Sequence, residues 1–482
     1  MKKKSLTLLL FLVLTFYSSF SYSQFSLWGM TQYGGSSNRG VIFTYDPSTS
    51  TFTKKLDFNG TTIRSTEPWG SLLLASDGNL YGMSSQGGGI QTGDLFEYNL
   101  LSETYTWLTS YMGDGGERPY GSLIQANNGK LYGMTSQSPL SIDVDGVMFE
   151  YDYITDTCPN IIYFDRCTIG GGPNGDLLQA SNGKLYGMTS YGNTTYGTMF
   201  EYKISSNNFT NLLVFNGTNG AGPLGSLIQA SNGKLYGLTQ YGGAYDYGVL
   251  FEYDTLSGIL TKKVDFDSIT TGSHPCGSLM QASNGKLYGV TSSGGTHNFG
   301  VLFEYNIAND TLINKFNFDN INGRNSHGTL MEASDGNLYG MTWEGGIHDM
   351  GVIFGYDTMT GTLTKKFDFD SIHGSYPHYT KLIEVPDTLV KVSKYTAKDI
   401  NINIYPNPNN GSAKIDYTLP PGVNEGEIVF YNLQGMEVKR FKVDRTFNTL
   451  LISTKDIAAG TYYYQLQTAG ENSGGKKMVV IK

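Results

Sequence analysis

The histidines are the residues of this sequence best suited to chemistry, and they are unevenly placed. All six lie between residues 274 and 378 of a 482-residue chain. A neutral imidazole can bind a metal ion, contact a ligand or exchange protons near neutral pH. No two histidines are spaced i, i+4, which weakens the case for a metal site. The functional hypothesis is a ligand or metal patch on one face, and the alternative is that extracellular loops drifted to histidine in the more similar copies. The six are His274, His297, His327, His348, His373 and His378.

Aromatic side chains also occur in three short segments that each contain a proline. The segments are Glu67-Pro68-Trp69, Arg118-Pro119-Tyr120 and Tyr376-Pro377-His378. An aromatic ring offers a rigid apolar face on which a sugar ring can stack. The alternative is that these side chains only pack the loops that carry them. We take as candidate ligand-binding residues His274, His327, His378, Trp69, Tyr120 and Arg118.

Established catalytic signatures are absent from the sequence. It has no Walker phosphate loop, no H-E-x-x-H and no paired C-x-x-C. The segment Asp143-Val144-Asp145-Gly146 is the nearest approach to a calcium loop, but it lacks the remaining ligand positions and the closing glutamate. We therefore expect no catalytic residue, no metal site and no cofactor. The three cysteines do not recur between repeats and are expected to be unpaired; they are Cys158, Cys167 and Cys276.

A tandem repeat must position all these residues. A phrase close to G-S-L-x-x-A-S-N-G-K-L-Y-G-M-T recurs, and a second aromatic follows each copy. Self-similarity at a fixed period of about 50 residues is typical of propellers and solenoids. The aromatic of the L-Y-G element falls at Trp28, Tyr81, Tyr132, Tyr186, Tyr236, Tyr288 and Tyr339, and the second aromatic falls at Phe43, Phe96, Phe149, Phe200, Phe251, Phe303 and Phe354.

Each copy predicts four short strands. In the sixth copy the apolar runs are 278–282, 286–291, 301–305 and 311–318, and Asn284-Gly285 is a strong hairpin signal between the first two. Four strands per unit and seven units predict a seven-bladed β-propeller over residues 24–385, with a stacked β-solenoid as the alternative. The chain supplies a spare first strand, Thr380 to Val385, which we expect to pair with Phe25 to Met30 and complete the first blade.

The repeat resembles the GloVer tandem repeat. The segments 75–82 and 333–340 match its A-S-D-G-x-L-Y-G pattern, whereas Gln137-Ser138-Pro139 departs from it in the third copy. The resemblance covers residues 25 to 385. It implies an extracellular, propeller-like array and carries no established activity.

The N-terminus has the features of a secretory signal peptide. Three lysines at positions 2–4 precede the apolar run Leu6 to Phe16, and Ser21-Tyr22-Ser23 places small residues where a signal peptidase cleaves. We expect residues 1–23 to be removed before Gln24. The net charge is −9 and no basic stripe is present, which argues against nucleic acid as a partner.

The C-terminus forms a separate module. After a linker at 386–400, residues 401–482 carry several short strands, which predict a small Ig-like β-sandwich. The module resembles the type A C-terminal sorting domain of the type IX secretion system, through Tyr405-Pro406-Asn407-Pro408, Gly460-Thr461-Tyr462-Tyr463 and the basic-apolar end at 476–482. That resemblance implies export, handling by the type IX machinery and removal of the module. An ordinary adhesive domain is the alternative.

The leading interpretation is an all-β protein, secreted or held on the outer cell surface, that binds without catalysing. An extracellular glycan or another surface polymer is the expected ligand, and the chain is expected to be monomeric. The alternative is a secreted propeller enzyme, a lyase or hydrolase of polysaccharide, and a third hypothesis is a structural surface-layer component. An enzyme is expected to break the repeat symmetry with acid–base groups at one opening of the central channel of the propeller.

Overall fold

The structure is a computed structural model that describes residues 25–88, 91–110, 116–138, 144–192, 196–386, 401–419, 423–432, 436–468 and 476–481. In these ranges the chain forms 37 β-strands and one 3₁₀ turn, Ile204–Ser206, so the protein is all-β. Within that part of the chain, no helix has the length and apolar character needed to cross a membrane. The expected signal segment 1–23, residues 387–400 of the expected linker, and Asp143 lie outside the described residues.

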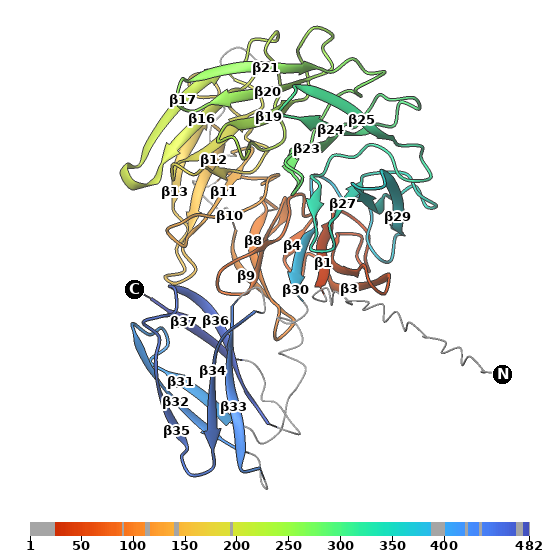
Figure 1. Cartoon of the computed structure of the whole chain (residues 1–482). Coiled ribbons are helices and arrows are strands. Elements are labelled where there is room, and N and C mark those ends of the chain that lie inside the picture. Colours follow the sequence, from red (N-terminus) through yellow and green to blue (C-terminus); the bar gives the residue numbers. More distant parts are fainter. Residues whose placement is uncertain are drawn as a thin grey trace, which may run out of the picture.

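The repeat region forms seven four-stranded antiparallel sheets, numbered here in chain order (Figure 1). The first sheet has the order β3 (Thr51–Asp57), β2 (Val41–Asp46), β1 (Phe25–Thr31), β30 (Ile383–Pro386). The second has β5 (Leu73–Leu74), β6 (Leu80–Ser84), β8 (Asp94–Asn99), β9 (Thr104–Ser110), with a two-stranded ribbon of β4 (Ser65–Thr66) and β7 (Gln86–Gly87) beside it. The third has β10 (Ile124–Gln125), β11 (Leu131–Thr135), β12 (Val144–Tyr151), β13 (Asn160–Asp165).

The remaining four sheets repeat the same order. The fourth has β14 (Leu178–Gln179), β15 (Leu185–Thr189), β16 (Thr198–Lys203), β17 (Asn208–Val214). The fifth has β18 (Ile228–Gln229), β19 (Leu235–Thr239), β20 (Val249–Asp254), β21 (Ile259–Asp265). The sixth has β22 (Met280–Gln281), β23 (Leu287–Val290), β24 (Val301–Asn306), β25 (Thr311–Asn317), and the seventh has β26 (Met331–Glu332), β27 (Asn337–Thr342), β28 (Val352–Asp357), β29 (Thr362–Asp368).

The sheets show why a glycine and a phenylalanine recur together in each repeat. The glycine of L-Y-G pairs with the recurring phenylalanine of the next strand, as Gly29 does with Phe43. A Cβ on Gly29 would lie 2.6 Å from Phe43 Cζ, and Gly82 and Phe96 show the same relation at 2.4 Å. The phenylalanine ring therefore lies over the bare glycine backbone, a pairing known to stabilise glycine in strands. The equivalent glycine contacts its phenylalanine in all seven sheets.

The first sheet contains both ends of the repeat region. Strand β30 pairs with β1 through four residue pairs, from Phe25↔Pro386 to Trp28↔Ile383. The expected pairing of the two chain ends is thus confirmed, although β30 begins three residues later than the predicted strand and includes Pro386. Hydrophobic clusters join each sheet to the next, and one cluster joins the seventh sheet to the first through Met341, Leu27 and Leu382.

Residues 401–481 form a separate C-terminal unit (Figure 1). One sheet contains β31 (Asn401–Tyr405), β32 (Ser412–Thr418) and β35 (Thr449–Ser453); the other has β34 (Glu437–Asp444), β33 (Glu425–Tyr431), β36 (Gly460–Gln467) and β37 (Lys476–Val480). Side chains of both sheets, among them Ile415 and Phe430, share a single core.

Candidate binding site

Seven equivalent loops, one before the first strand of each sheet, share a backbone conformation. In each loop one residue has a positive φ between 53° and 61°. A non-glycine residue in this conformation costs roughly 1–2 kcal/mol, so the surrounding bonds must hold it. In the second sheet, Glu67 N–H donates to the Arg39 carbonyl and the Glu67 carbonyl accepts from Ser85 N–H. The seven residues are Glu67, Arg118, Gly172, Gly222, His274, Asn325 and Tyr376.

Each of these loops then brings its backbone against that of the next sheet. A Cβ on Gly70 would lie 2.2 Å from the Gly121 carbonyl oxygen, and one on Gly121 would lie 2.5 Å from that of Gly175. Only glycine fits such an approach. The series continues through Gly225, Gly277 and Gly328, and Gly328 approaches the Thr380 carbonyl oxygen of the first sheet at 2.4 Å. The first-sheet loop is one residue longer than the other six, and Tyr379 is the extra residue.

The next residue of each loop extends this contact through hydrogen bonds. Ser71 N–H donates to Ser122 Oγ at 2.8 Å, and Ser122 N–H donates to Asp176 Oδ1 at 2.5 Å. The bonds continue from sheet to sheet as far as Thr329 Oγ1 of the seventh sheet, and Lys381 N–H of the first sheet donates to Ser71 Oγ at 2.7 Å. Among the described residues, Thr380 Oγ1 is buried without a partner, next to Tyr379. The seven loops are therefore fixed relative to one another.

The residue two after the positive-φ residue differs from sheet to sheet. Four sheets that follow one another in space, the seventh, first, second and third, carry large rings: His327, His378, Trp69 and Tyr120. The fourth, fifth and sixth carry Asn174, Leu224 and Cys276. We call the former group, together with Trp343 and Tyr379 that contact it, the aromatic arc.

The rings of the aromatic arc contact one another closely. Trp69 stacks on Tyr120 with ring centroids 4.2 Å apart, and His378 meets the edge of Trp69 at 4.3 Å. His327 Nδ1 lies 3.0 Å from His378 Nε2, so one imidazole donates a hydrogen bond to the other. Trp343 stacks on His327 with ring centroids 5.2 Å apart. Tyr379 stacks on His327 at 5.6 Å and on Trp69 at 5.9 Å.

Burial keeps the two imidazoles neutral. It lowers the pKa of His327 to about 4, and burial together with the His327 charge lowers the pKa of His378 still further. Burial also raises the pKa of Tyr379 well above its usual value. Among the described residues, three buried nitrogens of the arc have no hydrogen-bond partner: His378 Nδ1, Trp69 Nε1 and Trp343 Nε1. A buried polar atom without a partner costs about 1–3 kcal/mol, so these atoms call for a water molecule or a ligand.

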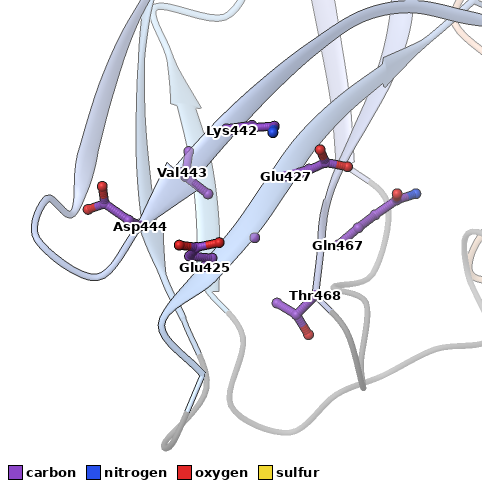
Figure 2. A pocket seen from close by; sticks show the side chains of 8 residues that line it. Glu425, Glu427, Lys442, Val443, Asp444, Gln467 and Thr468 are labelled. Carbon is purple, nitrogen blue, oxygen red and sulfur yellow. The ribbon is translucent and has the colours of Figure 1, made fainter.

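A small cavity lies beside the arc. It has a volume of about 20 Å³ and is lined by Tyr120, Asn174, Cys276, His327 and Tyr379, among others. That volume holds about one water molecule. A larger hollow of about 610 Å³ lies in the C-terminal unit, where Glu425, Glu427 and Lys442 line it (Figure 2). Figure 2 shows these side chains spread along the strands rather than converging on one point.

The sequence-predicted candidates fall into two groups. Trp69, Tyr120, His327 and His378 come together in the aromatic arc. His274 does not join it, because it occupies the positive-φ position two residues earlier in its loop, and its ring packs against Tyr241 and Tyr247.

Arg118 occupies the same loop position as His274, and its side chain is exposed. The prediction that grouped His274 with His327 and His378 was therefore wrong, because His274 lies two residues earlier in its loop than they do in theirs.

The other predicted features are resolved as follows. Cys158, Cys167 and Cys276 are free thiols, as expected. Asp145, in the segment compared with a calcium loop, forms an ion pair with Arg166. No group of three potential metal ligands occurs in the described ranges. His297, His348 and His373 are exposed.

Sequence reasoning missed Trp343 and Tyr379. Each departs from the series of equivalent residues: Tyr379 is an extra residue that the other six loops lack, and Trp343 stands where other repeats have serine or glutamine. Aligning the seven loops residue by residue would have identified both.

The repeated four-stranded sheets and the separate C-terminal module place the chain in the class of all-β repeat proteins. The chain belongs to the Gloeobacter/Verrucomicrobia repeat family, which matches residues 17–194, 141–313 and 195–405. A secretion system C-terminal sorting domain matches residues 403–482. The protein is thus a secreted repeat protein with a type IX sorting tail, which implies handling by that machinery and secretion or attachment to the cell surface.

Two solved structures share the fold of the repeat region. A putative 6-phosphogluconolactonase from Bacteroides fragilis has a TM-score of 0.54 at 17% identity, over 76% of this chain and 99% of its own. A putative 6-phosphogluconolactonase from Bacteroides uniformis has a TM-score of 0.53 at 15% identity, over 75% and 99%. These relatives are propeller-like, and at this identity the likeness concerns the fold alone. No curated protein sequence matches the chain.

Proposed function

We propose that this protein is a monomeric extracellular binding protein whose repeat region is a closed seven-bladed β-propeller and whose aromatic arc binds a glycan. Closure is supported by the pairing of β30 with β1 and by the core shared between the seventh and first sheets. The loop-to-loop contacts from Gly70 to Gly328 give further support. The C-terminal unit, with one core between two sheets, fits the expected Ig-like sandwich.

The observation that carries the proposal is where the repeat symmetry breaks. The L-Y-G glycine and its phenylalanine recur in every sheet, whereas the residue two after the positive-φ position changes from Trp69 to Leu224 to His378. Packing alone would have favoured one residue type at seven equivalent positions. The aromatic arc on one side and the smaller side chains on the other form an asymmetric site, as a ligand of defined shape requires.

The chemistry of the arc fits a sugar. A pyranose presents an apolar C–H face that an aromatic ring can cover, and hydroxyl groups around its edge. Trp69 and Trp343 offer both an indole face and a buried N–H without a partner in the described structure. His378 Nδ1 adds a third polar atom, which donates or accepts according to its tautomer.

Binding is favoured over the alternative, a secreted polysaccharide lyase or hydrolase. General acid–base catalysis is most efficient when the pKa of the group lies near the working pH. The pKa of His327 is lowered to about 4 and that of His378 further, so both are weak bases at neutral pH. Asp176, a carboxylate that lines the small cavity, accepts a backbone hydrogen bond from Ser122.

A glycan-array screen and a polysaccharide-cleavage screen on the secreted protein test the proposal together. We expect bound oligosaccharides, no new chain ends, and a roughly 10- to 30-fold loss of affinity in Trp69→Ala and in Trp343→Ala. Trp107→Ala is the matched control, because Trp107 lies on β9 under Arg64 and away from the arc. Equal affinity in all three variants would contradict the binding site, and cleavage products would favour the enzyme.

A further inference from the structure

Tyr463 of the C-terminal unit contacts the repeat region. Its side chain is 4% exposed. It belongs to β36, but it packs in a hydrophobic cluster of the repeat region and not in the core of the C-terminal unit. The tyrosine Oη lies 3.5 Å from the carbonyl oxygen of Asp77, in the turn between β5 and β6. Figure 1 shows β36 and β37 at the end of the C-terminal unit that faces the sheets. The ring therefore covers one hairpin turn of the second sheet.

The equivalent turns of other sheets are open. A Cβ built on Gly78 would lie 1.6 Å from Tyr463 Oη, whereas a Cβ on Gly129, Gly233, Gly285 or Gly336 meets nothing within 4 Å. The turn at Gly336 has the same local sequence, Ala-Ser-Asp-Gly-Asn-Leu-Tyr, as the turn at Gly78. The local sequence thus does not account for the contact, and the position in the second sheet does.

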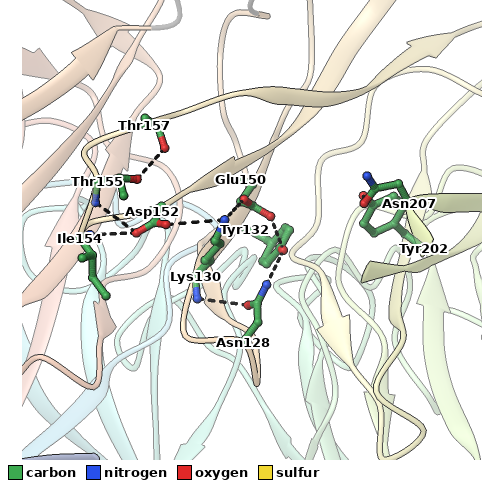
Figure 3. A network of polar contacts seen from close by, with 10 residues as sticks. All are labelled: Asn128, Lys130, Tyr132, Glu150, Asp152, Ile154, Thr155, Thr157, Tyr202 and Asn207. Atoms are coloured by element: carbon green, nitrogen blue, oxygen red, sulfur yellow. Dashed lines mark hydrogen bonds and ion pairs between the residues drawn. The ribbon is translucent and has the colours of Figure 1, made fainter. Parts of the chain in front are cut away.

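Charge also distinguishes the second sheet. In the third sheet, the lysine after the turn glycine pairs with a glutamate of the next long strand, Lys130 Nζ to Glu150 Oε1 at 2.5 Å (Figure 3). The fourth, fifth and sixth sheets repeat this ion pair. The second sheet keeps the glutamate, Glu97, but replaces the lysine with Asn79.

The positive charge of Lys477, in the C-terminal unit, acts on Glu97 from across the contact between the two units. Burial and Asp77 raise the pKa of Glu97, and Lys477 acts in the opposite direction. In the seventh sheet the lysine is also absent, as Asn337, but there the glutamate is replaced by Gly355. Among the described repeats that keep this glutamate, the second is the one without the lysine, and Asn79 Nδ2 donates a hydrogen bond to Glu97 Oε1 at 2.7 Å in its place.

The socket of Tyr463 depends on the first sheet as well. The hydrophobic cluster that Tyr463 joins contains Leu72 and Leu80 of the second repeat and Val385 of β30. Strands β30 and β5 also contact each other directly. The socket and the pairing of β30 with β1 therefore share one hydrophobic cluster.

We infer that the turn at Asp77–Gly78 is a dedicated docking surface for this chain's own C-terminal unit, which inserts Tyr463 and brings Lys477 to the side of Glu97. The dock holds the sorting unit in one orientation on a repeat region whose first sheet is complete. Removal of the sorting unit leaves an open socket and takes the charge of Lys477 away from Glu97.

The test uses the full chain and two matched substitutions. Gly78→Ala and Gly336→Ala carry the same strain, because the two φ values are 87° and 82°, but only the first collides with Tyr463. Loss of one buried aromatic contact corresponds to roughly a ten- to hundredfold change in an equilibrium constant. We expect hydrogen exchange of the 460–467 segment to accelerate by about that factor in Gly78→Ala, with an increased maximum dimension in small-angle scattering, and neither change in Gly336→Ala.

A charge exchange makes the test independent of folding. Lys477→Glu and Glu97→Lys should each loosen the contact, and the double variant should restore the protection of the 460–467 segment. Equal exchange in Gly78→Ala and Gly336→Ala would overturn the inference. So would a double variant that is no better protected than either single variant.

Discussion

Asp94 is a buried carboxyl at a position that is otherwise apolar or hydroxylic. Five of the equivalent strand positions carry valine and one carries Thr198. Asp94 is fully buried; its Oδ1 accepts hydrogen bonds from Ser65 Oγ and Ser84 Oγ, both at 2.5 Å. Its Oδ2 has no partner among the described residues. Ser65 itself stands where the other six repeats have glycine, so this polar cluster is specific to the second sheet.

The structure gives the size and sign of its effect on stability. Burial raises the pKa of Asp94 from 3.8 to about 6, against the lowering effect of Ser65, Ser84 and Arg64. Two pKa units correspond to about 3 kcal/mol. Between pH 4 and 6 the folded state binds a proton that the unfolded state has lost, so the free energy of unfolding falls as pH rises. The stabilising contribution is complete below pH 4 and lost above pH 6.

Urea unfolding of the full chain at pH 3.5 to 7 measures this contribution. We expect Asp94→Asn to gain about 3 kcal/mol relative to the wild type on going from pH 4 to pH 7, because it removes the titration. Asp94→Val should lose the same pH dependence, while its absolute stability also reflects Ser65 and Ser84 left without their acceptor. If the free energy of unfolding of the wild type minus that of the variant stays constant with pH, the argument is refuted.

The remaining predictions concern the first sheet, the arc and export. Deleting residues 379–385 should expose the β1 edge and cause earlier melting and aggregation; unchanged melting by circular dichroism would contradict ring closure. Because burial lowers the pKa of both imidazoles, His327 and His378 should stabilise the fold above pH 6.5, and this contribution should be lost as pH falls towards 4. Melting temperatures over that range should therefore fall less in His378→Gln than in the wild type. Intact mass of the secreted protein should show the loss of residues 1–23, and deletion of 401–482 should leave the protein in the periplasm; normal secretion of that variant would refute the sorting role.

The strand pattern could be predicted because it depends on short-range and repeated signals. Alternating residues, the Asn-Gly turns and the L-Y-G glycine each define a strand or turn within a few residues. The predicted strands at 301–305 and 311–318 correspond to β24 (Val301–Asn306) and β25 (Thr311–Asn317). The strand from the chain end, β30, was predictable because the first repeat lacks its own first strand.

The candidate site was only partly predictable, because residue type does not fix position within a loop. His274 and His327 both precede a first strand, yet a difference of two residues sends one to Tyr241 and the other to the arc. Tyr463 could not be placed at all, since its contact joins segments 386 residues apart. Such contacts depend on tertiary packing that no local pattern encodes.

The pairing of β30 with β1 has a mechanical consequence. Phe25 lies opposite Pro386, so the free ends of both strands emerge at the same end of the pair. Tension between the N-terminus and the C-terminal unit would peel the four residue pairs apart one after another instead of shearing them together. Contact of Tyr463 with the second sheet offers a parallel path for the load. Single-molecule stretching should therefore show a low first rupture force, and a lower one still in Tyr463→Ala.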